Sequence, residues 1–501
     1  MLGVNYRTSD TDTLDALSVI KAVLLFLGAF ALYFATRSPA LDEHDSVQFA
    51  MGVLDFNMWK DQPHAAGYPF FIFLGWIAEK FLGIGPDLSL HFISALGGAL
   101  FIAAWFLIIR LQFNERLAWW IALCLMITPA VWMTATKALT DSLAAGFVSV
   151  EILAALYFVK RRCFAALLAA ALSGAAATGT RPQMILVVLA ILLTALWRSR
   201  ADLKMSILTL SVFVVACLVW LLPMSYTQWR LRPDVSLWAV YPKLALHQWQ
   251  WRLDKPGVYL GAGDWSARYL GTRALFHFLG WFGLGFGFIK SVYLLVIGSA
   301  LALAGLAAYF SRLRKLRDGD FWRFHAPWAL VHVAVIFISL SPAQRYYLLV
   351  FPLLLVALMR GFLQMRVPWN WSALAFPALL LYIAVPLAIE NHHREPPALR
   401  LVRYLATLYP TEHRKDVVLL FNKVRRHAEW YAPGFVTVRQ VPPAHDLPKL
   451  IGDAAAVYTD DAKLPLPPGW SRVPLVAFTR SGIIYWKHHS VELYLIDRHA
   501  P

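Results

Sequence analysis

The chain has 501 residues, of which 59% are hydrophobic and only 15% are charged, and its mean hydropathy is +0.55. A soluble domain is closer to half apolar, with about a quarter of its residues charged, so this composition excludes a purely soluble protein. The formal net charge of +16 would suggest nucleic-acid binding in a soluble chain. In a membrane protein it is typical of Lys- and Arg-rich cytoplasmic loops, so we expect no nucleic-acid partner.

Apolar runs long enough to cross a bilayer as helices, which takes roughly 20 residues, recur along the chain. The first run is long and has no small-residue cleavage motif, so we interpret it as a span rather than a signal peptide. We predict a polytopic α-helical membrane protein with about eleven spans. They cover residues 17–36, 88–109, 117–134, 142–159, 163–179, 183–197, 205–224, 289–310, 326–341, 345–359 and 371–389.

Five connections between these spans are rich in Arg and Lys, which the positive-inside rule places in the cytoplasm. They are "RLQFNER", "KRR", "RSRADLK", "SRLRKLRDGDFWR" and "RGFLQMR". If all five are cytoplasmic, the apolar run 68–83 does not cross the membrane but lies at its outer surface as an interfacial or half-buried helix. The run 274–288 is then shallow or re-entrant. The same reasoning places the N-terminus in the cytoplasm and residues 37–87 outside.

The acidic sequence "DEHDSVQFA" follows the first span directly and places Asp42, Glu43 and Asp45 at the outer membrane edge. Ionisable groups at such positions are costly and usually functional. Asp45 also has a structural interpretation, because an acid followed three residues later by Gln48 forms a capping box at a helix N-terminus. The two interpretations are compatible, since a cap only fixes the position of the carboxylate.

Four further polar residues lie at the predicted outer face. His64 is in the turn "QPHAAGYP", Asp141 opens a span in "LTDSLAAGF", and Arg181 and Arg345 lie in "GTRPQ" and "SPAQRYYLLV". Each has a simpler explanation: a solvated loop histidine, a helix N-cap, or an arginine that snorkels to the interface. Their convergence with the acidic sequence on one side of the membrane favours a functional site.

Two longer segments also lie outside in this threading. The first is a Trp-rich loop at 225–275, which contains Trp249 and Trp251 and is a candidate to bind sugar or to close a site. The second is the tail, 390–501, whose short β-like runs alternate with helical stretches, so we predict a small α/β domain there. These runs are "VVLLF", "FVTVRQV", "AAVYTD", "PLVAF" and "VELYLI". The Pro-rich "EPPALR" separates this domain from a membrane domain at 1–389.

Several motifs are absent from the sequence. There is no Walker A motif, no glycine-rich dinucleotide fingerprint and no cluster with zinc-ligand spacing. The histidine pairs in "HHREPP" and "KHHS" have no matching acidic pattern. We therefore expect neither a metal site nor a cofactor.

The order of these elements over roughly residues 17–390 resembles the GT-C superfamily of integral-membrane glycosyltransferases. "DEHDSVQFA" resembles the acidic motif of that superfamily's first external loop, and "PHAAGYPFFIFLG" resembles the entry to the second of two juxtamembrane helices. "LTDSLAAGF", "GTRPQ" and "RYYLLVFP" resemble later, shorter motifs. The branch most similar to this chain includes protein O-mannosyltransferases and aminoarabinose-type lipid transferases.

The resemblance implies an inverting transfer of a sugar from a polyprenyl-phosphate donor to an acceptor hydroxyl on the extracytoplasmic face. Asp45 would be the general base, although the motif also fits Asp42 in a different register, and Asp141 would orient the acceptor. His64, Arg181 and Arg345 would hold the donor phosphate, because the planar guanidinium group suits phosphate. Contacts to the acceptor or sugar would come from Glu43, Trp249 and Trp251.

The predicted partners are therefore a lipid-linked sugar donor, a protein, lipid or glycan acceptor, and the bilayer, which we expect to be a bacterial inner membrane. The sequence leaves the sugar and the acceptor open. A lipid or sugar transporter is the alternative, but such a protein should show repeat symmetry and charges near the bilayer midplane. Only Glu151, which we interpret as a bundle-facing polar contact, lies deep in a span.

Overall fold

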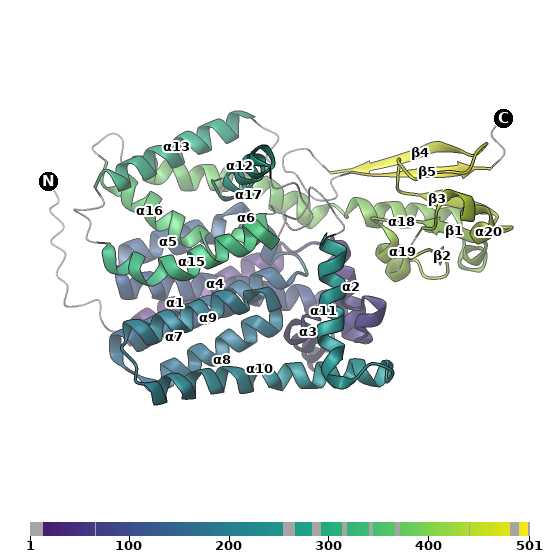
Figure 1. Ribbon diagram of the computed structural model, residues 1–501. Coiled ribbons are helices and arrows are strands. Elements are labelled where there is room, and N and C mark those ends of the chain that lie inside the picture. Colours follow the sequence, from purple (N-terminus) through teal and green to yellow (C-terminus); the bar gives the residue numbers. More distant parts are fainter. Residues whose placement is uncertain are drawn as a thin grey trace.

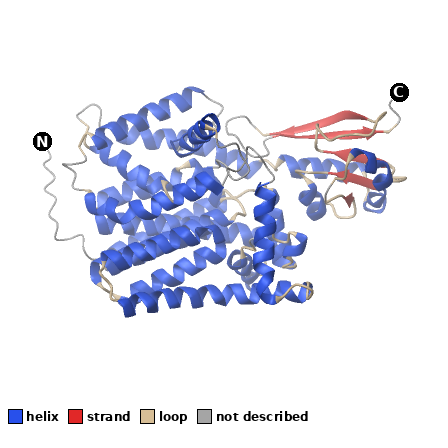
Figure 2. Ribbon diagram, in the orientation of Figure 1, coloured by secondary structure: helices blue, strands red, loops and turns tan. Residues whose placement is uncertain are grey.

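The computed structural model describes residues 14–65, 67–253, 266–282, 292–312, 318–339, 344–365, 371–439, 441–480 and 490–498. It consists of a helical bundle and a smaller tail that contains all the described strands (Figures 1 and 2). The tail lies beyond one end of the bundle, beside α2 (His44–Leu54).

The bundle helices follow the predicted apolar runs. They are α1 (Ala16–Ala35), α4 (Pro86–Gln112), α5 (Glu115–Ile127), α6 (Pro129–Ala135), α7 (Thr140–Arg161), α8 (Phe164–Thr180), α9 (Ile185–Arg198), α10 (Leu203–Leu231), α13 (Val292–Phe310), α15 (Gly319–Ser339), α16 (Phe351–Leu363) and α17 (Ser372–His393). In the described part, six helices are long and apolar enough to cross a membrane, or seven if α5 and α6, bent by 60°, form one broken span. Four shorter helices are also apolar. The number of crossings remains a prediction.

The five basic connections meet at one end of the bundle. Lys160 donates to the carbonyl of Leu111 at 2.6 Å, and Arg198 pairs with Asp320 at 3.3 Å. Other contacts link the remaining connections: His325 with Gln112, Arg360 with Asp318, and Arg312 with the carbonyl of Gln364. These mutual contacts show that the described parts of the five connections share one end of the bundle, while their cytoplasmic location remains a prediction.

The segment between α1 and α4 stays at the opposite end. It forms α2, a short 3-10 helix η1 (Met58–Lys60) and α3 (Pro69–Leu82). The helix α3 has 14 residues and packs against α2, α4, α8 and α10. The run 68–83 forms a helix, as expected, and its position at the outer membrane surface remains a prediction.

The Trp-rich segment is more helical than expected. The helix α10 continues to Leu231, α11 covers Leu237–Leu253, and α12 covers Ala267–Phe282. A hydropathy profile measures the apolar part of a helix, whereas α10 continues because its polar end is satisfied by protein contacts. Gln228 accepts from the amide of Met58 at 2.8 Å and donates to the carbonyl of Phe56 at 2.9 Å. The prediction of a loop was wrong over these helices.

Close backbone contact fixes α7 against α4. A Cβ atom on Gly97 would overlap the backbone of Leu143, and one on Gly146 would lie 2.6 Å from the carbonyl oxygen of Gly97. Small residues at such crossings let membrane helices approach closely. The contact positions the N-terminal turn of α7, which carries Asp141, against α4.

The tail contains a five-stranded mixed sheet in the order β2-β1-β3-β5-β4. The strands are β1 (Val417–Leu420), β2 (Val436–Thr437), β3 (Ala456–Thr459), β4 (Ser471–Thr479) and β5 (Ser490–Asp497). Each falls on one of the five predicted β-like runs. The strands β2, β1 and β3 are parallel, while β5 is antiparallel to β3 and β4. The tail helices are α18 (Pro397–Leu408), α19 (Arg425–Tyr431) and α20 (Leu447–Ile451).

Polar contacts attach the tail to the segment between α1 and α4. The hydroxyl of Tyr431 accepts from the amide of Leu41 at 2.9 Å and donates to Asp87 at 2.8 Å. Arg426 donates to the carbonyl of Lys60 at 2.5 Å, and Arg439 pairs with Asp61 at 2.6 Å. Because these contacts come from α19 and the residues after β2, one face of the tail covers the start of α2.

Candidate active site

Charged side chains from distant parts of the sequence form one cluster at the end of the bundle that faces the tail. Four carboxylates and four cations belong to it: Asp42, Glu43, Asp45, Asp141, Lys137, Arg181, Arg345 and Arg480. Their formal charges cancel. Such a balance is what permits ionised groups to lie together where most are shielded from water.

Arg345 lies at the centre of the cluster, in the short 3-10 helix η4 (Gln344–Tyr347) between α15 and α16. Its Nη1 lies 2.6 Å from Glu43, its Nη2 lies 3.4 Å from Asp45, and its Nε lies 3.9 Å from Asp141. Burial opposes the charge of this guanidinium, but the surrounding carboxylates, Glu43 first, raise its pKa well above the usual value. One rigid fork thus connects three acids.

Asp42 is held by two cations. Lys137 lies 2.6 Å from its carboxylate and Arg480, from the tail, lies 3.0 Å away. Burial alone would raise the pKa of Asp42, but Arg480 and Lys137 together hold it well below its ordinary value. Asp42 is therefore an ionised link between the bundle and the tail.

Asp141 and Arg181 form the innermost pair, and both are buried. The guanidinium carbon of Arg181 lies 4.8 Å from the ring centre of Tyr346. The guanidinium carbon of Arg345 lies 5.3 Å from the same ring centre. Burial raises the pKa of the Tyr346 phenol, but these two arginines outweigh it and lower the pKa below the ordinary value. The buried Nε of Arg181 has no hydrogen-bond partner among the described residues.

Asp45 is the most accessible acid of the cluster. Its side chain is 27% exposed, against 14% for Glu43, 8% for Asp42 and 5% for Asp141. Its contact with Arg345 is also longer than the contact of Glu43 with the same guanidinium. Asp45 is thus the carboxylate that is best placed to meet a molecule from solution.

The capping interpretations of these acids are wrong. The N-cap of α2 is Glu43, and Asp45 lies inside the first turn, while Gln48 bonds to His64 rather than closing a capping box. The N-cap of α7 is Leu139, with Asp141 in the first turn. Acids at these positions still gain from the helix dipole, so the dipole stabilises both charges without occupying their oxygens in a cap.

His64 joins the cluster through its neighbours. Its Nδ1 lies 2.9 Å from Gln48 and its Nε2 lies 2.8 Å from the hydroxyl of Tyr68. Tyr68 in turn interacts electrostatically with Arg181. His64 therefore orients the Tyr68 hydroxyl, which lies near Arg181.

The structure brings together all the predicted acids with Arg181 and Arg345. The side chains of Trp249 and Trp251 lie outside the described residues. The sequence reasoning assigned no role to Lys137, Tyr346 or Arg480. Tyr346 directly follows Arg345 in a quoted motif and Lys137 lies one turn before Asp141, so proximity was a usable signal for both. Nothing in the sequence indicated Arg480, which comes from the far end of the tail.

Comparisons with known proteins identify the architecture. The profile of the family described as dolichyl-phosphate-mannose-protein mannosyltransferase matches residues 61–226. No curated protein sequence matches the chain significantly. The solved structure of ArnT from Cupriavidus metallidurans bound to undecaprenyl phosphate is similar, with a TM-score of 0.55, 16% identity, and coverage of 96% of this chain and 98% of that one.

A second similar structure is the Archaeoglobus fulgidus oligosaccharyltransferase tethered to an acceptor peptide, with a TM-score of 0.52 and 12% identity. The match covers 88% of this chain and 69% of that one. Identities this low establish a shared fold. That fold is the one that the sequence motifs predicted.

Proposed function

Since the chain has the fold of the GT-C membrane glycosyltransferases, we propose that it moves a sugar from a polyprenyl-phosphate donor to an acceptor hydroxyl on the extracytoplasmic face of a bacterial inner membrane. The observation that carries the proposal is the contact between the accessible Asp45 and Arg345, whose side chain is 13% exposed. It supports the proposal because such a transfer needs a carboxylate as proton acceptor close to a cation that binds phosphate, and this contact joins a carboxylate to a guanidinium group.

The donor phosphate would bind at Arg181 and Arg345. Because the cluster is neutral as it stands, an added anion has to displace carboxylate contacts, and the longest are those of Arg345 with Asp45 and Asp141. The Nε of Arg181 also offers a buried N–H group without a partner in the described part of the chain. His64 would support the phosphate through Tyr68. The similar ArnT structure carries undecaprenyl phosphate, which is a ligand of this class.

The proposed reaction is a single displacement at the anomeric carbon. The acceptor oxygen attacks that carbon as its proton passes to the Asp45 carboxylate. The bond to the phosphate oxygen breaks, and the polyprenyl phosphate leaves with the electron pair, stabilised by the two guanidinium groups. One displacement inverts the anomeric configuration. Asp141 and Glu43 would orient the reacting groups through Arg345.

The test is transfer from a synthetic polyprenyl-phosphate sugar by the purified protein in detergent. We expect product of inverted anomeric configuration, activity largely resistant to chelator, and no activity with a nucleotide sugar, because fixed arginines can neutralise a monophosphate without a metal ion. Full activity with the nucleotide sugar, or complete loss with chelator, would exclude this mechanism.

The proposed orientation has a separate test. Reporter fusions after Ala388 and within residues 198–204 should give opposite signals, because the acidic cluster and the basic connections lie at opposite ends of the bundle. Identical signals would contradict an extracytoplasmic active site.

A further inference from the structure

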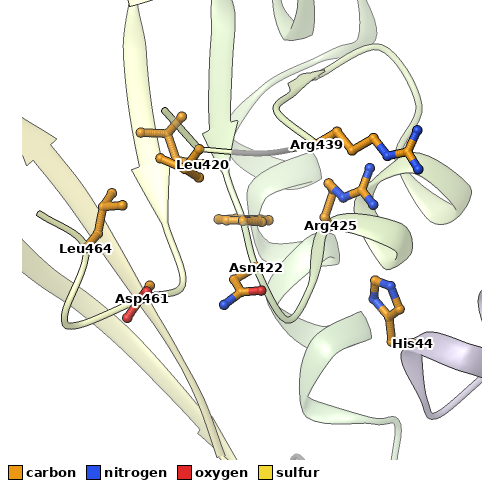
Figure 3. A pocket seen from close by; sticks show the side chains of 9 residues that line it. His44, Leu420, Asn422, Arg425, Arg439, Asp461 and Leu464 are labelled. Carbon is orange, nitrogen blue, oxygen red and sulfur yellow. The ribbon is translucent and has the colours of Figure 1, made fainter. Parts of the chain in front are cut away.

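A polar cavity of about 340 Å³ lies where the tail meets the start of α2 (Figure 3). It is formed by Leu420 at the end of β1 and by Asn422 and Asp461 beyond the ends of β1 and β3. Arg425 on α19, Arg439 after β2 and His44 on α2 complete it. None of these residues belongs to the ion cluster around Arg345. Its volume lies at the lower end of the range of small-ligand sites, roughly 300–1,000 Å³.

The topology of the tail sheet places this cavity where sheets of parallel strands commonly bind ligands. The chain leaves β1 through α19 to reach β2 on one side of β1, and then passes through α20 to β3 on the other side. In open sheets of parallel strands, ligands bind beyond the carboxyl ends of the strands where the connections diverge in this way. The segments 420–422 and 461–464 lie at those ends of β1 and β3.

One wall of the cavity is basic. Only the Nη1 of Arg425 has a hydrogen-bond partner among the described residues, Glu429 at 3.1 Å, which leaves its Nη2 and Nε for another acceptor. Arg439 is half exposed and binds Asp61 and the carbonyl of Trp59. Burial first, and then the neighbouring Arg426, lower the pKa of Arg425 below its usual value, although Glu429 opposes the shift.

The other wall is polar but not basic. Asp461 lies opposite the arginines and Asn422 lies between them in Figure 3. A carboxylate and an amide are the groups that bind sugar hydroxyls, because they accept and donate hydrogen bonds in fixed directions. His44 closes the cavity on the side of α2, and it directly precedes Asp45 in the first turn of that helix.

We propose that this cavity is an acceptor subsite that binds an acidic saccharide. The anionic group, a carboxylate or a phosphate on the sugar, binds Arg425 and Arg439, and the ring hydroxyls bind Asn422 and Asp461. This inference rests on the proposed function, since it makes the tail the part that presents the acceptor to Asp45. The acceptor is therefore anionic, and transfer to it depends on the tail.

The first experiment measures binding by the full-length protein in detergent, with no donor present. The probes are glucuronate, glucose 1-phosphate and methyl glucoside, titrated calorimetrically. We expect binding of the carboxylate probe, the phosphate probe or both, and their comparison identifies the anionic group; the neutral sugar should bind at least ten-fold more weakly. Equal binding of all three probes, or of none, would overturn the proposal.

Variants connect this binding to the cavity. Arg439→Gln, at a half-exposed position, should keep the fold and weaken the acidic probe by about ten-fold, the loss expected for a charge-assisted hydrogen bond. Arg425→Gln should weaken it further, and thermal unfolding identifies any loss of fold. The matched control is Arg323→Gln, which removes the same charge from an exposed position on α15 at the other end of the bundle. Unchanged binding in a folded Arg439→Gln protein would overturn the assignment.

A second measurement separates this inference from the proposed transferase activity. Hydrolysis of the polyprenyl-phosphate sugar by water needs the donor site and no acceptor. We expect Arg439→Gln to keep donor hydrolysis while losing transfer to an acidic acceptor. If the wild-type protein neither hydrolyses nor transfers but binds acidic sugars, the transferase proposal fails and the binding site stands. If hydrolysis and transfer to acidic acceptors both persist in Arg439→Gln, the subsite fails alone.

Discussion

Replacing Asp45 and Asp42 separately by Asn distinguishes the proposed base from the structural acid beside it. Both changes remove one negative charge and keep the shape of the side chain. The structure predicts opposite consequences, because Asp45 is the most accessible acid of the cluster and lies 3.4 Å from Arg345, whereas Asp42 is buried between Lys137 and Arg480.

For Asp45→Asn we expect transfer to fall about 100- to 10,000-fold, the usual contribution of a general base. Stability should change by no more than about 1 kcal/mol, as for other partly exposed ion pairs. For Asp42→Asn the loss of stability should reach about 3–5 kcal/mol, because two buried cations lose their shared partner.

The pH dependence of the Asp42 effect follows from its lowered pKa. A group whose pKa is depressed in the folded protein contributes stability that is fully present above its ordinary pKa of 3.8 and is lost as the pH falls through the folded value. The stability difference between wild type and Asp42→Asn should therefore stay constant from about pH 5 to about pH 8.

The assay combines sugar transfer in detergent with thermal unfolding followed by tryptophan fluorescence, which the 21 tryptophans of the chain make sensitive. The reasoning would be refuted by an Asp45→Asn protein with near-normal turnover, since the proton would then go elsewhere. It would also be refuted if Asp42→Asn unfolded at the wild-type temperature, or if Asp45→Asn were the less stable of the two.

Three further predictions concern the bundle. Arg345→Lys should lower transfer by about 100-fold, because one ammonium group cannot replace a guanidinium group that reaches three acids. The loss corresponds to two charge-assisted contacts of about 1.5 kcal/mol each, and wild-type turnover would contradict this. Glu151→Gln should leave the unfolding temperature unchanged or raise it, because burying a neutral side chain costs less free energy than burying a charged one. Both buried carboxylate oxygens of Glu151 lack a hydrogen-bond partner among the described residues. A lower unfolding temperature would show that the charge is required. Gly146→Val should destabilise the protein and reduce transfer by separating α7 from α4, whereas the control Gly28→Val, at an open position on α1, should be tolerated; equal effects of the two would argue against the close contact.

The sequence determined the elements of this protein more securely than their ends. Apolar length predicted the bundle helices, the charge of the connections predicted which of them share one end, and short β-like runs predicted the described strands of the tail. These features are local, because a helix or strand is encoded by the periodicity of the residues within it. The prediction of a loop at 225–275 was wrong, because α10 extends beyond its apolar run and its polar end is stabilised by the contacts of Gln228.

The candidate site was predictable as a set of residues but not as an arrangement. The sequence indicated that Asp42, Glu43, Asp45, Asp141 and Arg345 would gather at one face, because each lies at the same end of a predicted span. Only the tertiary structure decided which acid each cation holds. It assigned Asp42 to Lys137 and to Arg480, and it left Asp45 accessible. Pairing of this kind depends on distances between groups that are tens to hundreds of residues apart, and no local pattern records those distances.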